Sequence, residues 1–358
     1  MGVTVPMASP QVTDRVLLKP EPLRAFAAEI FRNAGLAADQ AAITAEVLVW
    51  VDLRGLPSHG VMRVPPYVAW IDSGLINTSA APKVVLRKGA VAKIEGDSAA
   101  GPAAMAFAVD TAIAQAREHA LAWVLVRNHI HAGALGFYAG RIAAAGMAGI
   151  VMSALRPMMA YHGTRGSAAS TNPIAIAVPG GIMLDMSTSM SSRGKINVAR
   201  VAGKPLPPGI ALDRDGRPTT DPNAAATLTP MAGPKGAGLS LMIECLASLA
   251  LGHSLIAPAL NDPALMTDYR QNSLVVAMDL SVAGDVERFK DEVAALAQSI
   301  KAQPRADGFD EILMPGERGA REFDRRCREG VPIPVKTWQQ ITEVAARFGI
   351  KAPGDMAA

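Results

Sequence analysis

The stretch LAWVLVRNHIHAGALG, residues 121–136, runs from a β-rich segment at 121–126 toward a glycine-spaced helix expected over 135–145. Before it, residues 84–94 alternate between apolar and polar side chains as strands do, and an alanine-rich helix is expected over 102–119. After it, a further strand is expected over 149–155. Strands that alternate with helices in this way predict an α/β architecture.

Working outward, the two ends of the chain are expected to be mostly helical. Near the N-terminus we predict helices over 23–34, 39–53 and 66–73, after a loose tail at 1–14. The remaining predictions are apolar runs at 174–178 and 182–186, helices over 239–251, 286–301, 318–328 and 337–348, strands over 274–280 and 311–313, and linkers over 203–222 and 304–315.

Composition excludes several classes of protein. Half of the 358 residues are hydrophobic and 19% are charged, which excludes a disordered chain. The net charge of +3 is spread along the chain and aromatic residues make up 4%, so we expect no nucleic-acid partner. Cys245 and Cys327 are the only cysteines, which fits a reducing cytoplasm. We find no targeting signal, and the apolar stretch 238–261 contains Glu244, so we expect a buried helix there and no membrane partner.

Common catalytic and nucleotide-binding motifs are absent from the sequence. It contains no G-x-G-x-x-G after a strand, no G-x-x-x-x-G-K-[ST], no H-E-x-x-H and no G-x-S-x-G. This argues against an ordinary dinucleotide-binding fold, P-loop NTPases, zincins and ordinary α/β-hydrolases.

The first candidate site is RGLPSHGVMR, residues 54–63. His59 and Arg63 are four residues apart and share a face if the segment is helical. An imidazole can pass a proton near neutral pH, and a guanidinium can hold a carboxylate through two hydrogen bonds. Ser58 can orient the imidazole. The alternative is that Ser58 caps a helix and His59 only packs.

The second candidate site is RNHIHAGALG, residues 127–136, directly after a predicted strand. Small residues here let a ligand approach the backbone, and a helix start offers N–H groups to a phosphate. His129 and His131 lie two apart, but no acidic residue or cysteine lies nearby, so we expect no metal. The competing interpretation is a tight junction with polar residues in a turn.

Two further segments carry small polar and basic residues where strands end or helices begin. Hydroxyl and backbone N–H groups in such places suit ribose and phosphate oxygens, and basic side chains neutralise phosphate charge; ordinary turn chemistry is the alternative. The first of these segments contains Thr171, Asn172, Asp185, Met186, Ser187, Arg193, Gly194 and Lys195, and the second is the glycine-rich helix entry around Lys235.

Taken in order, these segments resemble the malate/L-lactate dehydrogenase family that is distinct from the ordinary lactate dehydrogenases. That family includes ureidoglycolate dehydrogenase, 2,3-diketogulonate reductase, sulfolactate dehydrogenase and Δ1-piperideine-2-carboxylate reductase. The motifs that carry the resemblance are Ser58-His59-Gly60 with Arg63, residues 128–133, Thr171-Asn172-Pro173, residues 185–189, residues 218–222, Lys235-Gly236 and Met314-Pro315-Gly316-Glu317.

The resemblance implies a fold of its own, with a large mixed, substantially antiparallel sheet flanked by helices. It implies a helical substrate and dimerisation domain built from both chain ends, placed at 15–126 plus 310–350, and an NAD(P)-binding domain at 127–309. It also implies a cytoplasmic homodimer whose cofactor is NAD or NADP. Arg156, Arg165 and Arg193 are each candidates for a 2′-phosphate contact.

The resemblance also implies a role for each matching residue. His59 is expected to be the proton donor with Ser58 as its partner, and His131 is a rival for that role. Arg63 and Thr171, with Asn172 beside it, are expected to contact the substrate. The expected cofactor contacts are His131, Ala132, Gly133, Ala134, Leu135, Asp185, Met186, Ser187, Arg193, Gly194, Lys235, Pro315, Gly316, Glu317 and Arg318.

The sequence departs from the family pattern near the expected substrate pocket. Lys195 stands where some members carry an acid that completes a relay with Ser and His, and residues 161–170 lack the usual glycine pair. The expected reaction is hydride transfer to or from C2 of a small 2-oxo or 2-hydroxy acid. Reduction of a cyclic imino acid is the alternative, and a non-catalytic nucleotide or acid sensor is the remoter one.

Overall fold

The computed structural model describes residues 15–354, so the tail expected at 1–14 lies outside the described residues. The chain divides into two compact units. Among the described residues, unit 1 comprises residues 15–72, 179–182 and 284–354, and unit 2 comprises residues 73–178 and 183–283.

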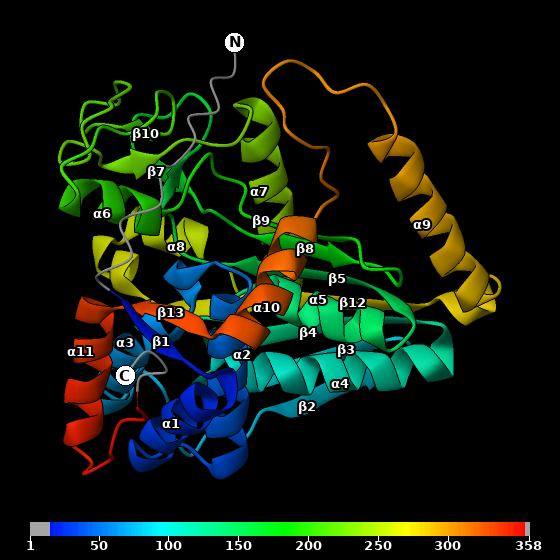
Figure 1. The fold of residues 1–358 in the computed structure, drawn as a ribbon, viewed down its shortest axis with the longest axis horizontal. Coiled ribbons are helices and arrows are strands. Elements are labelled where there is room, and N and C mark those ends of the chain that lie inside the picture. The colour runs from blue at the N-terminus through cyan, green and yellow to red at the C-terminus, as the bar shows by residue number, and fades with distance from the viewer. Residues whose placement is uncertain (1–14, 355–358) are drawn as a thin grey trace. The chain divides into compact units, whose positions relative to one another are not determined.

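A seven-stranded sheet forms the centre of unit 2, in the order β2-β3-β4-β12-β5-β8-β9 (Figure 1). Its strands are β2 (Lys83–Lys88), β3 (Val91–Ala100), β4 (Leu121–Ile130), β12 (Arg270–Asp279), β5 (Met147–Ala154), β8 (Ile174–Ala177) and β9 (Met183–Met186). Only β3 and β4 pair in parallel, and the other neighbours are antiparallel. The large mixed sheet expected from the sequence is therefore confirmed.

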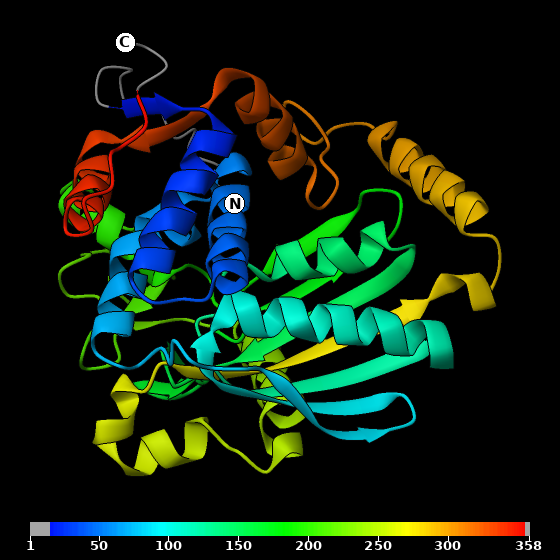
Figure 2. The ribbon, with the colours of Figure 1, turned by 90° about the horizontal axis from the view of Figure 1, so that it is seen from below.

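Helices cover both faces of this sheet (Figure 2). Along β4, Leu125 belongs to the apolar cluster formed with α7 (Pro234–Ala247), while Val124 and Val126 are buried on the opposite face. The helices that pack on the sheet besides α7 are α4 (Gly101–His119) and α5 (Leu135–Ala144). The alternation along β4 therefore places successive apolar side chains on the two helix-covered faces of the sheet.

A smaller sheet in unit 2 has the order β10-β11-β6-β7. It consists of β6 (Met159–Ala160), β7 (Ser167–Ala169), β10 (Ala211–Leu212) and β11 (Thr227–Leu228). It shares an apolar cluster with Ile196 of helix α6 (Arg193–Val201). A short helix, α8 (Ile256–Asn261), and short 3₁₀ turns, η3 (Leu249–Leu251) and η4 (Pro263–Thr267), complete unit 2 before β12.

Unit 1 is mostly helical. Its helices are α1 (Pro20–Asn33), α2 (Ala38–Leu53), α3 (Val64–Asp72), α9 (Val286–Lys301), α10 (Glu317–Glu329) and α11 (Val335–Ala346). The strands β1 (Arg15–Leu18) and β13 (Val331–Pro334) pair antiparallel and so join segments more than 300 residues apart in the chain. α2 contacts both α1 and α10, which brings the two chain ends into one body.

Several expectations differ from the structure. Residues 73–126, placed in the first domain, lie in unit 2 because β2, β3 and β4 belong to its sheet, and α9 lies in unit 1. The strand expected at 311–313 is wrong, since these residues have no strand partner in the described chain. The sequence analysis predicts no helix at α6 and no strand at β13, which contains Pro332 and Pro334, residues that a two-stranded edge tolerates.

One described segment, Pro234–Leu251, is long and apolar enough to cross a membrane by length and composition alone. Its Ile243, Ala247 and Leu251 pack into the core of unit 2, and the buried Glu244 accepts hydrogen bonds from the backbone N–H groups of Leu255 and Ile256. The helix therefore behaves as a core element of unit 2, as the sequence predicted.

Candidate active site

The residues 57–63 form two short 3₁₀ turns, η1 (Pro57–His59) and η2 (Val61–Arg63), between α2 and α3. The helical turn that would place His59 and Arg63 on one face is therefore absent. Ser58 Oγ lies 3.0 Å from His59 Nδ1, and Arg63 Nε donates to the carbonyl of Ser58 at 2.8 Å. The loop thus brings hydroxyl, imidazole and guanidinium together by a different local structure from the one expected.

The electrostatic state of His59 follows from its surroundings. Burial, and after it the positive charge of Arg63, lower the pKa of His59 to about 4. The imidazole is therefore neutral at pH 7.

Asp52, in the last turn of α2, lies directly beneath this loop. Its side chain is buried, and Oδ2 accepts a hydrogen bond from Val61 N at 2.6 Å. A Cβ on Gly60 would lie 2.1–2.3 Å from the Asp52 carboxylate atoms, so only glycine fits. Burial raises the pKa of Asp52 to about 7, against the hydrogen bond from Val61 and the charge of Arg326. Sequence reasoning missed Asp52, although an acid within an otherwise apolar helix end is a usable signal.

The turn at residues 314–318 is also in unit 1 and is tied to α2. Arg54 Nη2 donates to the carbonyl of Gly316 at 2.9 Å. Glu317 accepts from Met314 N and pairs with Lys301 and Arg321, and these contacts, the hydrogen bond from Lys301 first, lower its pKa to about 2. The carboxylate of Glu317 therefore holds the turn together.

In unit 2, the segment 131–135 follows β4. Side chains from β12, β9 and α5 hold this segment and the start of α5 in place. Ala132 N donates to Gln271 Oε1 at 3.0 Å, and the Tyr138 hydroxyl donates to the carbonyl of Ala132. Gly136 N donates to Asp185 Oδ2 at 2.9 Å. Two of the N–H groups that the sequence offered to a phosphate are thus used by protein side chains, whereas His131 is half-exposed.

A buried polar chain leads to that segment from His129. His129 Nε2 lies 2.8 Å from Ser273 Oγ, Ser273 Oγ donates to Ser153 Oγ at 3.0 Å, and Ser153 Oγ donates to Gln271 Oε1 at 3.3 Å. Burial lowers the pKa of His129 to about 4, so the ring is neutral. Nδ1 of the same ring lies 3.5 Å from the carbonyl oxygen of Ile130. The chain of contacts ends on Gln271 Oε1, the oxygen that accepts from Ala132 N.

The predicted substrate segment at 171–173 has two different kinds of residue. Thr171 is half-exposed, and its carbonyl accepts from Thr188 N at 3.2 Å. Asn172 is fully buried: Oδ1 accepts from Leu155 N at 3.1 Å and Nδ2 donates to the carbonyl of Ser240 at 2.9 Å. The Asn172 side chain is therefore occupied by the protein, which indicates a positioning role.

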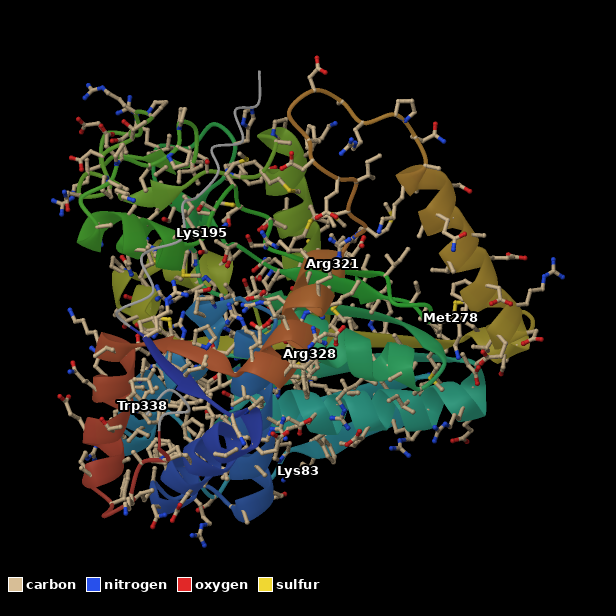
Figure 3. The ribbon with its side chains drawn as sticks, in the orientation of Figure 1. Lys83, Lys195, Met278, Arg321, Arg328 and Trp338 are labelled. Atoms are coloured by element: carbon tan, nitrogen blue, oxygen red, sulfur yellow. The ribbon has the colours of Figure 1, made fainter. Side chains whose placement is uncertain are left out.

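The basic residues predicted to meet the cofactor lie at helix starts of unit 2. Lys195 is exposed on α6 (Figure 3), where its backbone N–H meets the Ser192 cap. Arg193 is exposed and donates to the carbonyl of Ala226, and Gly194 follows it in the first turn. Lys235 is exposed in the first turn of α7.

Two observations bear on whether a dinucleotide fits unit 2. The Ser170 and Thr188 hydroxyls are buried and have no hydrogen-bond partner in the described part of the chain. They stand in the segments that also carry Thr171 and Ser187, and such hydroxyls suit ribose or phosphate oxygens. Gly236, in contrast, is required by packing, because a Cβ there would lie 2.4 Å from the carbonyl oxygen of Met231.

Within residues 15–354, no group of three or more His, Cys, Asp or Glu side chains is placed to hold a metal ion. His129 is buried against Ser273 while His131 is half-exposed beyond the end of β4. The described residues thus give no support to a metal site built on these two histidines.

Comparisons with known proteins give a family match and several similar proteins. The family described as malate/L-lactate dehydrogenase matches residues 18–342. An L-sulfolactate dehydrogenase from Methanocaldococcus jannaschii is 34% identical over 94% of this chain and 98% of its own, and its solved structure superposes with a TM-score of 0.84.

Two other relatives differ in their named reactions. An NAD(+)-dependent ureidoglycolate dehydrogenase from Escherichia coli O157:H7 is 31% identical over 86% of this chain and 90% of its own. The structure of Δ1-piperideine-2-carboxylate reductase from Pseudomonas syringae is 27% identical, covers 92% of this chain and 99% of its own, and has a TM-score of 0.79.

Proposed function

The chain belongs to the malate/L-lactate dehydrogenase family, and from that membership we propose that it is an NAD(P)-dependent oxidoreductase. Its relatives include hydroxy-acid dehydrogenases, so the family supports an oxidoreductase that acts on a small hydroxy acid. The reaction we propose is hydride transfer between the nicotinamide and C2 of a 2-hydroxy or 2-oxo carboxylic acid. The observation that carries it is the Ser58–His59–Arg63 loop, which joins a proton-transfer group to a carboxylate clamp.

We assign a role to each group of this loop. His59 exchanges the proton of the substrate oxygen, Ser58 orients the ring through Nδ1, and Arg63 binds the carboxylate. Because His59 is neutral at pH 7, its resting form suits the acceptance of a proton as the hydroxy acid is oxidised. In the reverse direction the imidazole must first gain a proton, and a bound anionic substrate favours that charged form.

For the cofactor, NAD or NADP, we assign the segments of unit 2. Residues 131–135 would line the nicotinamide half, and Asp185, Met186, Ser187, Arg193, Gly194 and Lys235 would contact the remainder. The turn at 315–318 would contribute from unit 1. When bound, the cofactor supplies or accepts the hydride, and the protein supplies orientation and the proton. Lys195 and His131 remain candidates for the proton-transfer network.

Reduction of a cyclic imino acid is the second candidate function. The similarity to the solved structure of a Δ1-piperideine-2-carboxylate reductase favours it. Protonation of an imine nitrogen needs the same His59 and the same carboxylate clamp. A panel of 2-oxo acids and cyclic imines, followed by the absorbance of NADH and NADPH, separates the two reactions. Tight cofactor binding without turnover on either set would instead favour a sensor.

Substitutions test the assigned roles. We expect His59→Ala to lower kcat by about 10²–10⁴-fold, the value of a positioned general acid or base, with cofactor affinity nearly unchanged. Arg63→Ala is expected to raise KM for the acid, and Arg63→Lys to restore only part of the loss because an ammonium lacks the planar fork. If His59→Ala keeps wild-type kcat while His131→Ala abolishes turnover, His131 is the proton-transfer residue.

A further inference from the structure

A cavity of about 170 Å³ lies in unit 2, and none of its lining residues has a role in the function proposed above. Arg156, His253 and Arg270 are its basic lining residues, and Leu255, Pro258 and Leu265 give it apolar walls. An engineered cavity of roughly 150 Å³ holds a benzene molecule, so this one is large enough for a small organic acid. Apolar walls with a few polar groups are typical of small-molecule sites.

Of the two arginines that line the cavity, one is paired with a carboxylate of the described chain and the other is not. Arg270 is paired with Asp268, whose oxygens lie 2.8 and 3.0 Å from Arg270 Nε, so this pair is neutral. Arg156 has no carboxylate partner among the described residues: its Nη1 donates to the carbonyl of Met266 at 2.5 Å, and its guanidinium lies 4.8 Å from the Tyr269 ring centroid. The carbonyl and the ring fix the guanidinium in place and leave its positive charge uncompensated.

More positive charge lies near Arg156. Arg193 and Arg200 donate to the carbonyls of Ala226 and Pro222, and neither pairs with a carboxylate in the described chain. After burial, the charges of Arg156 and Arg200 lower the pKa of Arg193, so both of these guanidinium groups act on that of Arg193. A group of unneutralised arginines favours the binding of an anion.

The cavity is also close to the predicted cofactor segment along the sheet. Arg270 is the register partner of Ile130, the residue before His131. The carbonyl of His253 accepts from Asn272 Nδ2 at 2.9 Å, and Asn272 Oδ1 accepts from Asn128 N at 3.1 Å. The C-terminal end of β4 and the N-terminal end of β12 lie side by side, and both the walls of the cavity and the segment that starts at His131 are built on them.

We propose that this cavity binds the acid group of a small organic anion, with the Arg156 guanidinium as its principal partner. The inference rests on the proposed function, because that function names the two molecules that could supply such an acid group. One is a second carboxylate or sulfonate on the substrate, and the other is the 2′-phosphate of NADP. The shared chemistry is a compact oxyanion that accepts hydrogen bonds from a guanidinium.

Sulfate binding, measured by calorimetry at constant ionic strength, tests the site without turnover. Arg63→Met is the background protein, so that the proposed carboxylate clamp contributes no sulfate binding. In that background we expect Arg156→Met, which keeps the apolar stem, to weaken sulfate binding at least tenfold, and Arg156→Lys to weaken it less. Arg117→Met, an exposed helix arginine elsewhere in unit 2, is the matched control and should change nothing. Equal sulfate affinity in Arg156→Met and Arg117→Met would overturn the proposal.

Kinetics then identify the source of the acid group. If the substrate supplies the acid group, Arg156→Met raises the KM for oxaloacetate at least tenfold and leaves the KM for 2-oxobutyrate unchanged. If the cofactor supplies the acid group, the variant raises the KM for NADPH and leaves the KM for NADH unchanged. A wild-type protein with no turnover on any acid would contradict the proposed function, while the sulfate measurement would still decide whether the site exists.

Discussion

Gly60 is the residue at which the proposed catalytic loop admits no side chain, because Asp52 fills the space that a Cβ would take. We expect Gly60→Ala to displace Val61 from Asp52 and to destabilise unit 1 by about 1–3 kcal/mol, the usual cost of overpacking. The kcat should fall as the Ser58–His59 pair moves. Gly284→Ala is the control, since nothing lies within 4 Å of its Cβ position. Urea unfolding and steady-state kinetics on both variants give the comparison, and equal behaviour of the two would show that Asp52 does not position the loop.

The charge of Asp52 is a separate question from its shape. Asp52→Asn keeps an oxygen that can accept the hydrogen bond from Val61 N, and it replaces the titratable carboxyl group with an amide that does not titrate. Since the folded pKa of about 7 lies above the ordinary value of 3.8, the wild type loses stability as the pH rises from about 4 through 7. We expect unfolding free energies of Asp52→Asn to lack this loss. A pH dependence that is unchanged in the variant would assign it to another group.

The pH dependence of catalysis belongs to His59. Its pKa of about 4 means that the neutral form, which accepts the proton in oxidation, predominates above that pH. We expect kcat/KM for oxidation to rise with pH through about 4 and then to level, and kcat/KM for reduction to fall as the pH rises through the same value. Initial rates in both directions check this, with the residual activity of His59→Gln as control. An oxidation profile with its only inflection near 6.5 would show that His59 is not perturbed in this way.

Gln271 provides a prediction about the cofactor segment. Gln271→Leu removes the acceptor for Ala132 N and for the chain of hydroxyls that begins at His129. Gln115→Leu is a matched control, because Gln115 is another buried glutamine of unit 2, bonded to the carbonyl of Gly89. Gln271→Leu should lose about 1–3 kcal/mol of stability because it leaves the buried Ala132 N without an acceptor, and only this variant should weaken NADH or NADPH affinity in fluorescence titrations. Equal cofactor affinity in the two would remove the positioning role.

At the scale of single residues, the sequence identifies the candidate reactive side chains but does not identify the residues that position them. Ser58, His59 and Arg63 stand within six residues, so their proximity can be read directly. Asp52 and Gln271 act through partners that are 9 and 139 residues away along the chain, and neither residue type marks a site by itself. Such contacts depend on tertiary packing, which one sequence does not display.

At the scale of elements, periodicity predicted the long segments and failed on the short ones. Helix α9 is amphipathic and its predicted bounds, 286–301, agree with the structure. Helix α6 is not predicted because its first residues, Arg193 and Lys195, are interpreted from the sequence as ligand contacts or turn residues, although Ser192 before them caps the helix. The two-residue strands of the smaller sheet carry too little pattern to be found, since each depends on partners supplied by other segments.

Domain organisation shows the same limit. The boundary expected at 126/127 cuts through β4, a strand of ten residues that pairs with both β3 and β12. The sequence there changes from apolar to polar at Arg127, which resembles a boundary but is the end of a buried stretch of the strand. A strand order that joins β4 to β12, 140 residues later, follows from long-range pairing and cannot be obtained from local pattern.

At the scale of the whole molecule, we predict a homodimer, as the resemblance implies. Helix α7 exposes Leu241 and Met242, which fall at helical spacing on one face with Gly238, a position with open space around it, and the 3₁₀ turn after the helix exposes Leu249. Exposed apolar side chains grouped on one element favour an interface between protein chains. Light scattering should therefore give twice the 37.3 kDa mass of the chain.

A charge on that face tests both the dimer and its location. We expect Met242→Glu to shift the scattering mass toward the monomer in a concentration-dependent way, because the carboxylate would be buried without a partner. Val198→Glu, at an exposed apolar residue of α6, is the control and should leave the dimer intact. A wild type that is monomeric with full turnover would contradict the dimer. A Met242→Glu dimer of unchanged affinity would place the interface on another surface, because a buried, unpaired carboxylate costs too much to go unnoticed.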